Sequence, residues 1–292
     1  MLTATKPIVD VIRQRFSCRT YLEQSISAEK RQALKTFIDN LQNGPFGGHP
    51  HFHLVAANKE DSRALRGLGT YGFIQGATGF IIGTLDEGER NLEDYGYLME
   101  EIILFATSLD LGTCWLGGSF TRSRFARKIN VSDDKLIPAV TSIGEIADVE
   151  DARNGSLRRR INADQRLLWE RLFFNQKFGT PLSPEESGEY ATPLEMLRIG
   201  PSASNKQPWR VIKDGNAWHF YLQRTKGYRE GALARFIGIA DIQRLDIGIA
   251  MCHFELTACE LGLSGKWLSA APDIVKPDDL TEYLVSWVEK SE

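Results

Sequence analysis

The chain has 292 residues, of which 42% are hydrophobic and 25% charged. This is globular composition, long enough for one large or two ordinary domains with a sizeable core. A net charge of -3 and a pI near 6.0 exclude a global attraction to nucleic acids or anionic membranes. The N-terminus lacks the apolar run of a signal peptide, and no later stretch is long and uncharged enough to cross a bilayer. We therefore expect a cytoplasmic protein.

The predicted elements follow one order in each half of the chain. In the first half the pattern predicts helices at 8–15 and 27–43, extended chain at 51–57, a strand at 78–85, a long helix over 92–106 and a last strand at 136–146. In the second half it predicts helices at 164–175 and 190–198, extended chain at 209–215, a long helix over 242–256 and a strand at 283–289. Helices and strands mix without strict alternation, which favours an α+β fold.

Two pairs of segments align with each other, which indicates an internal duplication. DYGYLMEEIILFATSLDLGTCWLG (94–117) aligns without a gap on DIGIAMCHFELTACELGLSGKWLS (246–269), so that Asp94 meets Asp246 and Trp115 meets Trp267. Upstream, GPFGGHPHFHLVA (44–56) aligns on GPSASNKQPWRVI (200–212). Shared order and spacing favour duplication over chance similarity between two amphipathic helices.

Four cysteines and three histidines in the chain are candidate metal ligands. Cys18, Cys114, Cys252 and Cys259 lack the short paired spacing of a zinc site, so we expect four free thiols. His49, His51 and His53 alternate, which on a strand places all three on one face. No further ligand lies nearby in sequence, so we predict no metal site.

Three stretches carry a resemblance to a known family. RQRFSCRTY (13–21), LGTCWLGG (111–118) and GPSASNKQPW (200–209), together with the arginines at 158–160, resemble signatures of the nitroreductase family of FMN enzymes. That family is ordinarily a homodimer with two FMN sites at the subunit interface, and this duplicated chain resembles its fused branch. The resemblance implies a nitroreductase-like α+β fold, with an antiparallel sheet covered by helices. It also implies a monomer whose halves, 1–163 and 164–292, form an intramolecular pseudo-dimer with the flavin between them.

The resemblance places the flavin phosphate near the N-terminus. It implies that Arg15, Ser17 and Arg19, with Phe16 between them, bind FMN. Guanidinium groups suit bidentate capture of a phosphate dianion. Arg158 and Arg160 correspond to a basic pair that completes the phosphate pocket in the family, although an arginine run on its own is more often a solvated face.

The same resemblance assigns two further segments to the flavin. Pro201, Ser202, Ala203 and Asn205 are expected to lie along the ring and the ribityl chain. Gly117 and Gly118 resemble the glycine stretch whose backbone faces flavin N5, and glycine permits that close approach. Gln207, Pro208 and Trp209 are expected to fix the loop.

The implied function is that of an FMN-dependent oxidoreductase. NADH or NADPH gives hydride to the flavin in a ping-pong cycle, and a small-molecule electron acceptor such as a nitroaromatic or a quinone then takes its place in one shallow pocket. No residue is assigned a chemical step, because the flavin performs the chemistry. One alternative is an FMN-binding module without turnover, for flavin sensing, storage or destruction. Another takes TRSRFARK (121–128) as a nucleic-acid surface; the acidic chain disfavours it, and we expect no nucleic-acid or membrane partner.

The duplication also predicts one FMN per chain. The first copy of the loop has Phe46 and His49 where the second has Ser202 and Asn205. The second half reads RLFFNQKFG (171–179) where the first has its arginine-serine stretch. The only complete set therefore combines the N-terminal arginines with the C-terminal loop.

Overall fold

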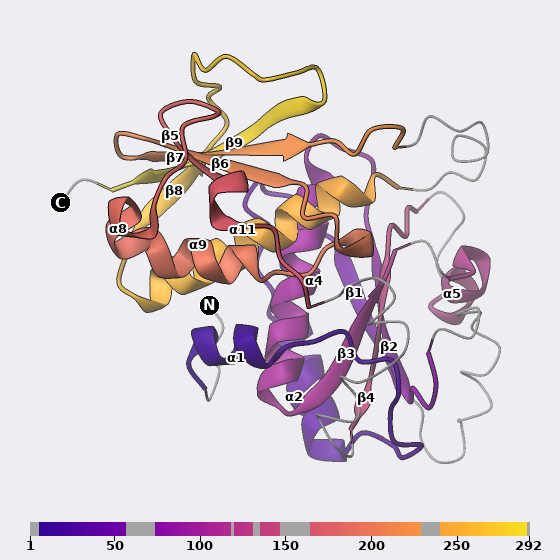
Figure 1. Cartoon of the computed structure of the whole chain (residues 1–292). Helices are drawn as coiled ribbons and strands as arrows, with labels where there is room; N and C mark the ends of the chain where they lie inside the picture. Colours follow the sequence, from indigo (N-terminus) through magenta and orange to yellow (C-terminus); the bar gives the residue numbers. More distant parts are fainter. Residues whose placement is uncertain are drawn as a thin grey trace.

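The computed structural model describes residues 6–56, 74–117, 120–130, 135–146, 164–228 and 240–290. Two antiparallel-type sheets stand on either side of a central pair of long helices, α4 and α11 (Figure 1). The elements of the first half are α1 (Ile8–Gln14), α2 (Ala28–Asp39), β1 (His51–Ala56), β2 (Gly79–Thr84), α4 (Asn91–Ser108), β3 (Leu111–Leu116), α5 (Arg122–Lys128) and β4 (Val140–Glu145). Those of the second half are η1 (Trp169–Arg171), β5 (Phe173–Asn175), α8 (Pro184–Ser187), η2 (Gly188–Tyr190), α9 (Ala191–Arg198), η3 (Ala203–Asn205), β6 (Trp209–Asp214), β7 (Ala217–Gln223), α11 (Ile242–Glu260), β8 (Gly265–Leu268) and β9 (Thr281–Glu289).

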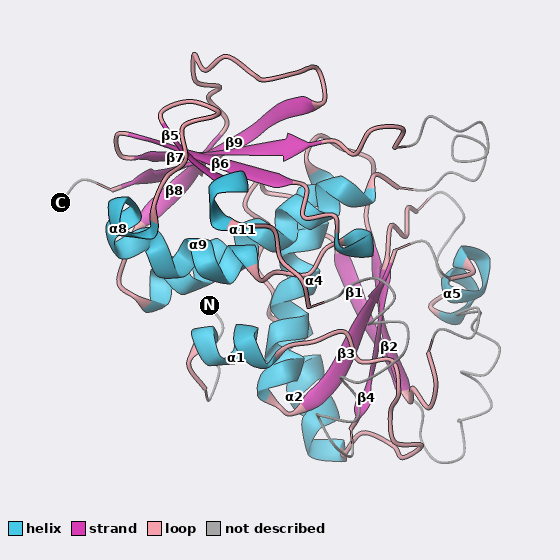
Figure 2. Cartoon of the chain, viewed as in Figure 1, coloured by secondary structure: helices cyan, strands magenta, loops and turns pink. Residues whose placement is uncertain are grey.

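The two sheets share one topology. The first has the strand order β1-β2-β4-β3, and the second has β6-β7-β9-β8 with β5 added at its edge. Each sheet takes its strands from one half of the chain, and helices cover both sheets (Figure 2). The α+β prediction and the tandem arrangement of two halves are confirmed. The predicted boundary at residue 163 lies outside the described residues and stays a prediction.

The two long helices cross at a pair of glycines that the duplication relates to each other. A Cβ on Gly96 would overlap the Leu245 carbonyl oxygen, and a Cβ on Gly248 would overlap the Glu93 carbonyl oxygen. Gly248 corresponds to Gly96 and Leu245 corresponds to Glu93 in the alignment of the halves. The crossing therefore has local two-fold pseudo-symmetry, and the absence of side chains there lets the helix backbones touch.

We expect Gly248→Ala to destabilise the protein by about 1–3 kcal/mol, because the added methyl meets rigid backbone that cannot move aside cheaply. Thermal unfolding followed by circular dichroism measures the change. Gly88→Ala is the matched control, since the nearest neighbour of its Cβ would be the Asn91 Cβ at 3.9 Å. Equal melting temperatures for the two variants would mean that the crossing tolerates a wider separation.

One predicted helix is wrong. Residues 164–175 form no α-helix where the structure describes them; they contain the 3₁₀ turn η1 and the strand β5. Phe173 is fully buried and pairs in parallel with Val211 of β6, and its ring packs edge-on against Trp169 at 4.5 Å. The turn that follows takes positive φ at Gln176 and Gly179, which ends the strand. Burial of Phe173 in the second sheet, with Trp169 packed against it, overrides the helical pattern.

The supposed counterpart of the arginine-serine stretch is also misplaced. Ser17 bridges Thr113 of β3, and Cys18 N–H donates to the Thr113 carbonyl at 2.8 Å. The segment 171–179 instead places β5 beside β6, the strand that corresponds to β1 rather than to β3. The two segments therefore lie at opposite edges of equivalent sheets.

All four cysteines are free, as predicted, and only Cys259 is not fully buried. His51 and His53 are exposed on β1, and the His49 and His51 rings meet edge-on at 5.1 Å. Within the described ranges no group of three or more histidine, cysteine, aspartate or glutamate residues could hold a metal ion. None of the helices in those ranges is long and apolar enough to cross a membrane.

Candidate functional site

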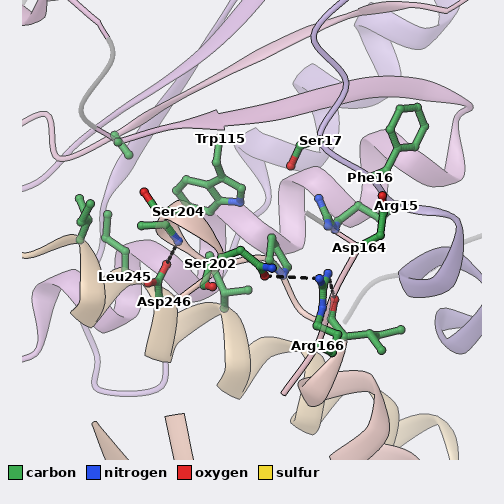
Figure 3. A pocket seen from close by; sticks show the side chains of 18 of the residues that line it. Arg15, Phe16, Ser17, Trp115, Asp164, Arg166, Ser202, Ser204, Leu245 and Asp246 are labelled. Carbon is green, nitrogen blue, oxygen red and sulfur yellow. Dashed lines mark hydrogen bonds between the residues drawn. The ribbon is translucent and has the colours of Figure 1, made fainter. Parts of the chain in front are cut away.

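A cavity of about 580 Å³ lies between the two halves, within the range typical of small-molecule sites. Its walls come from α1 and the segment after it, from β3, from the loop before β6 and from α11. Figure 3 shows Trp115 and Ser17 on one side and Ser202 and Asp246 on the other. The cavity therefore lies where segments far apart in sequence meet.

Most of the residues predicted for the site line this cavity. They are Arg15, Phe16, Ser17, Arg19, Gly117, Pro201, Ser202, Ala203 and Asn205. Gly118, Arg158 and Arg160 lie outside the described residues. The structure thus brings the arginine-serine stretch of one half against the loop of the other, while the binding role of each residue stays a prediction.

The loop before β6 is held in a strained conformation by its own polar groups. Ser204, Asn205 and Gln207 all have positive φ, which costs free energy unless the surroundings enforce it. Gln207 is buried; its N–H donates to Ser202 Oγ at 2.8 Å, and its Oε1 accepts from the Leu167 N–H at 2.8 Å. These contacts agree with the expectation that Gln207 fixes the loop.

Asn205 makes contacts with the protein as well as lining the cavity. Its Nδ2 donates to the Gln165 carbonyl at 2.9 Å, and its Oδ1 accepts from Arg166 Nη1 at 3.4 Å. Arg166 also donates to the Ile199 carbonyl at 2.8 Å. Asn205 and Arg166 therefore form one polar wall of the cavity.

Several guanidinium groups make the end of the cavity near α1 basic. Arg13, Arg15, Arg19 and Arg166 all line it, against the single carboxylate of Asp164 on that side. Arg19 Nη1 donates to the Ser17 carbonyl at 3.3 Å, which holds its guanidinium against the backbone of the same segment. An anionic group is the ligand that this end favours.

Arg15 belongs to a buried ionic cluster behind the cavity wall. Its Nε lies 3.6 Å from Oε1 of Glu100, whose side chain is completely buried in α4. Glu100 Oε2 accepts from Trp115 Nε1 at 2.6 Å, and its Oε1 lies 2.9 Å from His253 Nε2. His253 Nδ1 is 2.9 Å from the Met196 carbonyl and must donate to it, so the short contact on the other side requires a proton between Nε2 and Glu100.

Asp246 is a buried acid in the cavity wall. Its Oδ1 accepts from the Ala203 N–H at 2.9 Å, which ties α11 to the loop. Its Oδ2 is buried and has no hydrogen-bond partner in the part of the chain that the structure describes. Burial raises the pKa of Asp246 to about 8; the Ala203 N–H opposes this shift and the Asp241 charge adds to it.

The chain is similar in sequence and in fold to members of one protein family. Residues 7–258 match the family described as "Putative TM nitroreductase". The chain belongs to the nitroreductase family. No curated protein matches it significantly. A "putative nitroreductase" structure from Thermotoga maritima has 19% identity and a TM-score of 0.61, over 99% of this chain and 96% of that one.

Shorter structures match about half of the chain. One is a "putative nitroreductase in complex with FMN" from Desulfovibrio desulfuricans, with 21% identity and a TM-score of 0.41, over 49% of this chain and 88% of that one. Another is a "Putative NADH Oxidase" from Clostridium acetobutylicum, with 24% identity and a TM-score of 0.39, over 48% of this chain and 89% of that one.

In this member of the family, the first copy of the loop makes different contacts. The Arg90 guanidinium lies over the Phe46 ring, 5.0 Å from its centroid, and also donates to the Leu284 carbonyl. Asp94, the counterpart of Asp246, accepts from the N–H groups of Phe46 at 2.9 Å and Gly48 at 2.6 Å. Both of its oxygens are thus used by the loop, whereas Asp246 uses one.

Among the cavity-lining residues that sequence reasoning missed are Trp115, Asp164, Arg166 and Asp246. Trp115 and Asp246 carried a signal, because each aligns with an identical residue in the other half. Asp164 and Arg166 have no such pattern, and only the tertiary structure brings them to the loop.

Proposed function

We propose that this nitroreductase family member binds FMN and uses it to pass electrons from NADH or NADPH to a small electron-poor acceptor, such as a nitroaromatic or a quinone. The observation that carries the proposal is the cavity in which the N-terminal arginines meet the C-terminal loop. We further propose that a single chain suffices, because one cavity draws its walls from both halves.

The cavity fits the three chemically different parts of FMN. Arg19 and Ser17 at the basic end would hold the phosphate. Pro201, Ser202 and Ala203 would lie along the ring and the ribityl chain. Apolar atoms of Trp115, Leu245 and Ile249 offer a surface for a flat ring, and Gly117 lets backbone approach it. The side chains of Trp115, Leu245 and Ile249 would also keep water from the ring.

A bound flavin would supply the redox chemistry, taking up hydride and releasing electrons to the acceptor. The chain itself would bind the flavin, orient it and exclude water from its ring. The loop is preorganised by Gln207 and by the Ala203 contact to Asp246, so little ordering is needed when a ligand binds. Nitroaromatics and quinones are flat, and the same apolar wall would accept them after the nicotinamide leaves.

The test is a spectrum of the purified full-length chain, loaded with FMN and kept without oxygen. We expect flavin absorbance that NADH or NADPH bleaches and that a nitroaromatic or a quinone then restores. Bound flavin that neither nucleotide bleaches would support the alternative of a binding module without turnover. Failure to bind FMN at all would refute the assignment of the cavity.

A further inference from the structure

Asp246 and Asp94 occupy the same position in the two long helices but differ in what their oxygens contact. The Asp94 oxygens each accept a loop N–H. Asp246 accepts only the Ala203 N–H, through Oδ1, and Oδ2 has no partner among the described residues. A buried polar atom without a partner costs free energy, so each one in a native protein requires an explanation, and in the wall of a cavity a bound ligand is one. Asp246 lines the cavity, and Figure 3 shows it beside Ser202 and Ser204.

The hydrogen bonding of Asp246 also decides where a proton would sit. Oδ1 already accepts the Ala203 N–H, so a proton on this carboxyl belongs on Oδ2. Burial raises the pKa of Asp246 to about 8, which keeps the group neutral at pH 7. A neutral carboxylic acid in an apolar wall is a hydrogen-bond donor that a carboxylate cannot be.

We propose that Asp246 is a flavin-binding residue whose Oδ2–H donates a hydrogen bond to an acceptor atom of the flavin ring, while its Oδ1 holds the loop at Ala203. The inference rests on the proposed function, since it takes a flavin as the occupant of the cavity. It gives the unpartnered Asp246 oxygen a partner, whereas the equivalent acid in the first half, Asp94, already has both oxygens occupied by loop N–H groups.

Other charged groups around Asp246 are paired or lie across the cavity. On α11, Asp241 pairs with Arg224 at 2.6 Å, and on α4, Glu93 pairs with Arg244 at 2.6 Å. Tyr228 accepts from the Ile242 N–H at 3.0 Å. The remaining charged groups in the cavity wall are Arg13, Arg15, Arg19, Asp164 and Arg166. Burial raises the pKa of the Asp246 carboxyl to about 8, within the range between pH 7 and pH 9.

The proposal predicts an affinity that falls with pH. Below pH 8 the donor is present, and above pH 8 its population decreases tenfold for each pH unit. The dissociation constant for FMN, measured by quenching of flavin fluorescence, should therefore be about tenfold higher at pH 9 than at pH 7. Riboflavin should show the same dependence, because the effect belongs to the ring and not to the phosphate.

Asp246→Asn separates this role from a merely structural one. The amide keeps an acceptor for Ala203 and a donor toward the ligand, but it does not titrate in this range. We expect affinity close to wild type at pH 7 and no loss by pH 9. Asp94→Asn, the matched control, should keep the pH dependence of the wild type. Circular dichroism at both pH values verifies that all three proteins are folded.

The outcomes distinguish the two proposals. A wild-type chain that binds no flavin at either pH refutes the proposed function. Wild-type binding that is equal at pH 7 and pH 9, or an Asp246→Asn variant that weakens with pH as the wild type does, overturns the role of Asp246 and leaves the proposed function standing. Folded Asp246→Asn protein without affinity at pH 7 also overturns it, because it would mean that a carboxylate is required.

Discussion

Glu100→Gln is expected to lower the free energy of unfolding by about 3–5 kcal/mol, the typical effect of removing one partner from a buried ion pair. The Glu100 side chain is fully buried and the Arg15 side chain is 5% exposed. Without the carboxylate, the Arg15 charge loses its counter-charge in a medium of low polarity. The cluster connects α1, α4, β3 and α11, so its loss weakens the contact between the halves.

Urea unfolding followed by circular dichroism measures this effect. Glu89→Gln is the control, because the Glu89 side chain is 90% exposed and lies 3.7 Å from Arg90; exposed pairs contribute about 1 kcal/mol or less. If Glu100→Gln and Glu89→Gln unfold at the same urea concentration, the buried cluster does not stabilise the fold. A second consequence is weaker flavin binding by Glu100→Gln, since Arg15 and Trp115 line the cavity.

The sequence predicted the parts of the site that are encoded locally. The loop from Pro201 to Asn205 has turn residues at fixed offsets, and the stretch from Arg15 to Arg19 alternates charge and hydroxyl. The duplication supplied the long-range information, because the loop of the second half keeps Ser202 and Asn205 where the loop of the first half has Phe46 and His49, so the N-terminal arginines were expected to meet the second loop. The cavity between them follows that expectation.

The parts that the sequence did not predict depend on contacts between distant segments. Glu100 and His253 lie in the two long predicted helices, and nothing local shows that they meet each other across α4 and α11. The helix predicted at 164–175 failed because the apolar spacing there fits a helix and a buried strand equally well. Pairing with β6 and burial of Phe173 decide between them, and both are tertiary effects.

Ser202→Phe is expected to lower the flavin content of the protein from one FMN per chain to nearly none. The substitution copies the first half, where Phe46 stands at the equivalent position and the Arg90 guanidinium covers its ring. At position 202 the ring would extend into the cavity that Trp115 and Ala203 line. A rigid aromatic side chain in the space required by a flat ligand cannot be accommodated by small shifts in a packed wall.

Flavin released by heat, per mole of polypeptide, measures the outcome. Ser202→Ala is the first control: it removes the hydroxyl that accepts the Gln207 N–H at 2.8 Å but adds no bulk, so affinity should fall about tenfold at most. Phe46→Ser is the second control and should still release one FMN per chain, because the first half's copy of the loop lacks an arginine-serine segment beside it. Two flavins from the wild type, or a Ser202→Phe variant that keeps its flavin while Phe46→Ser loses it, would place the ligand at the other copy of the loop.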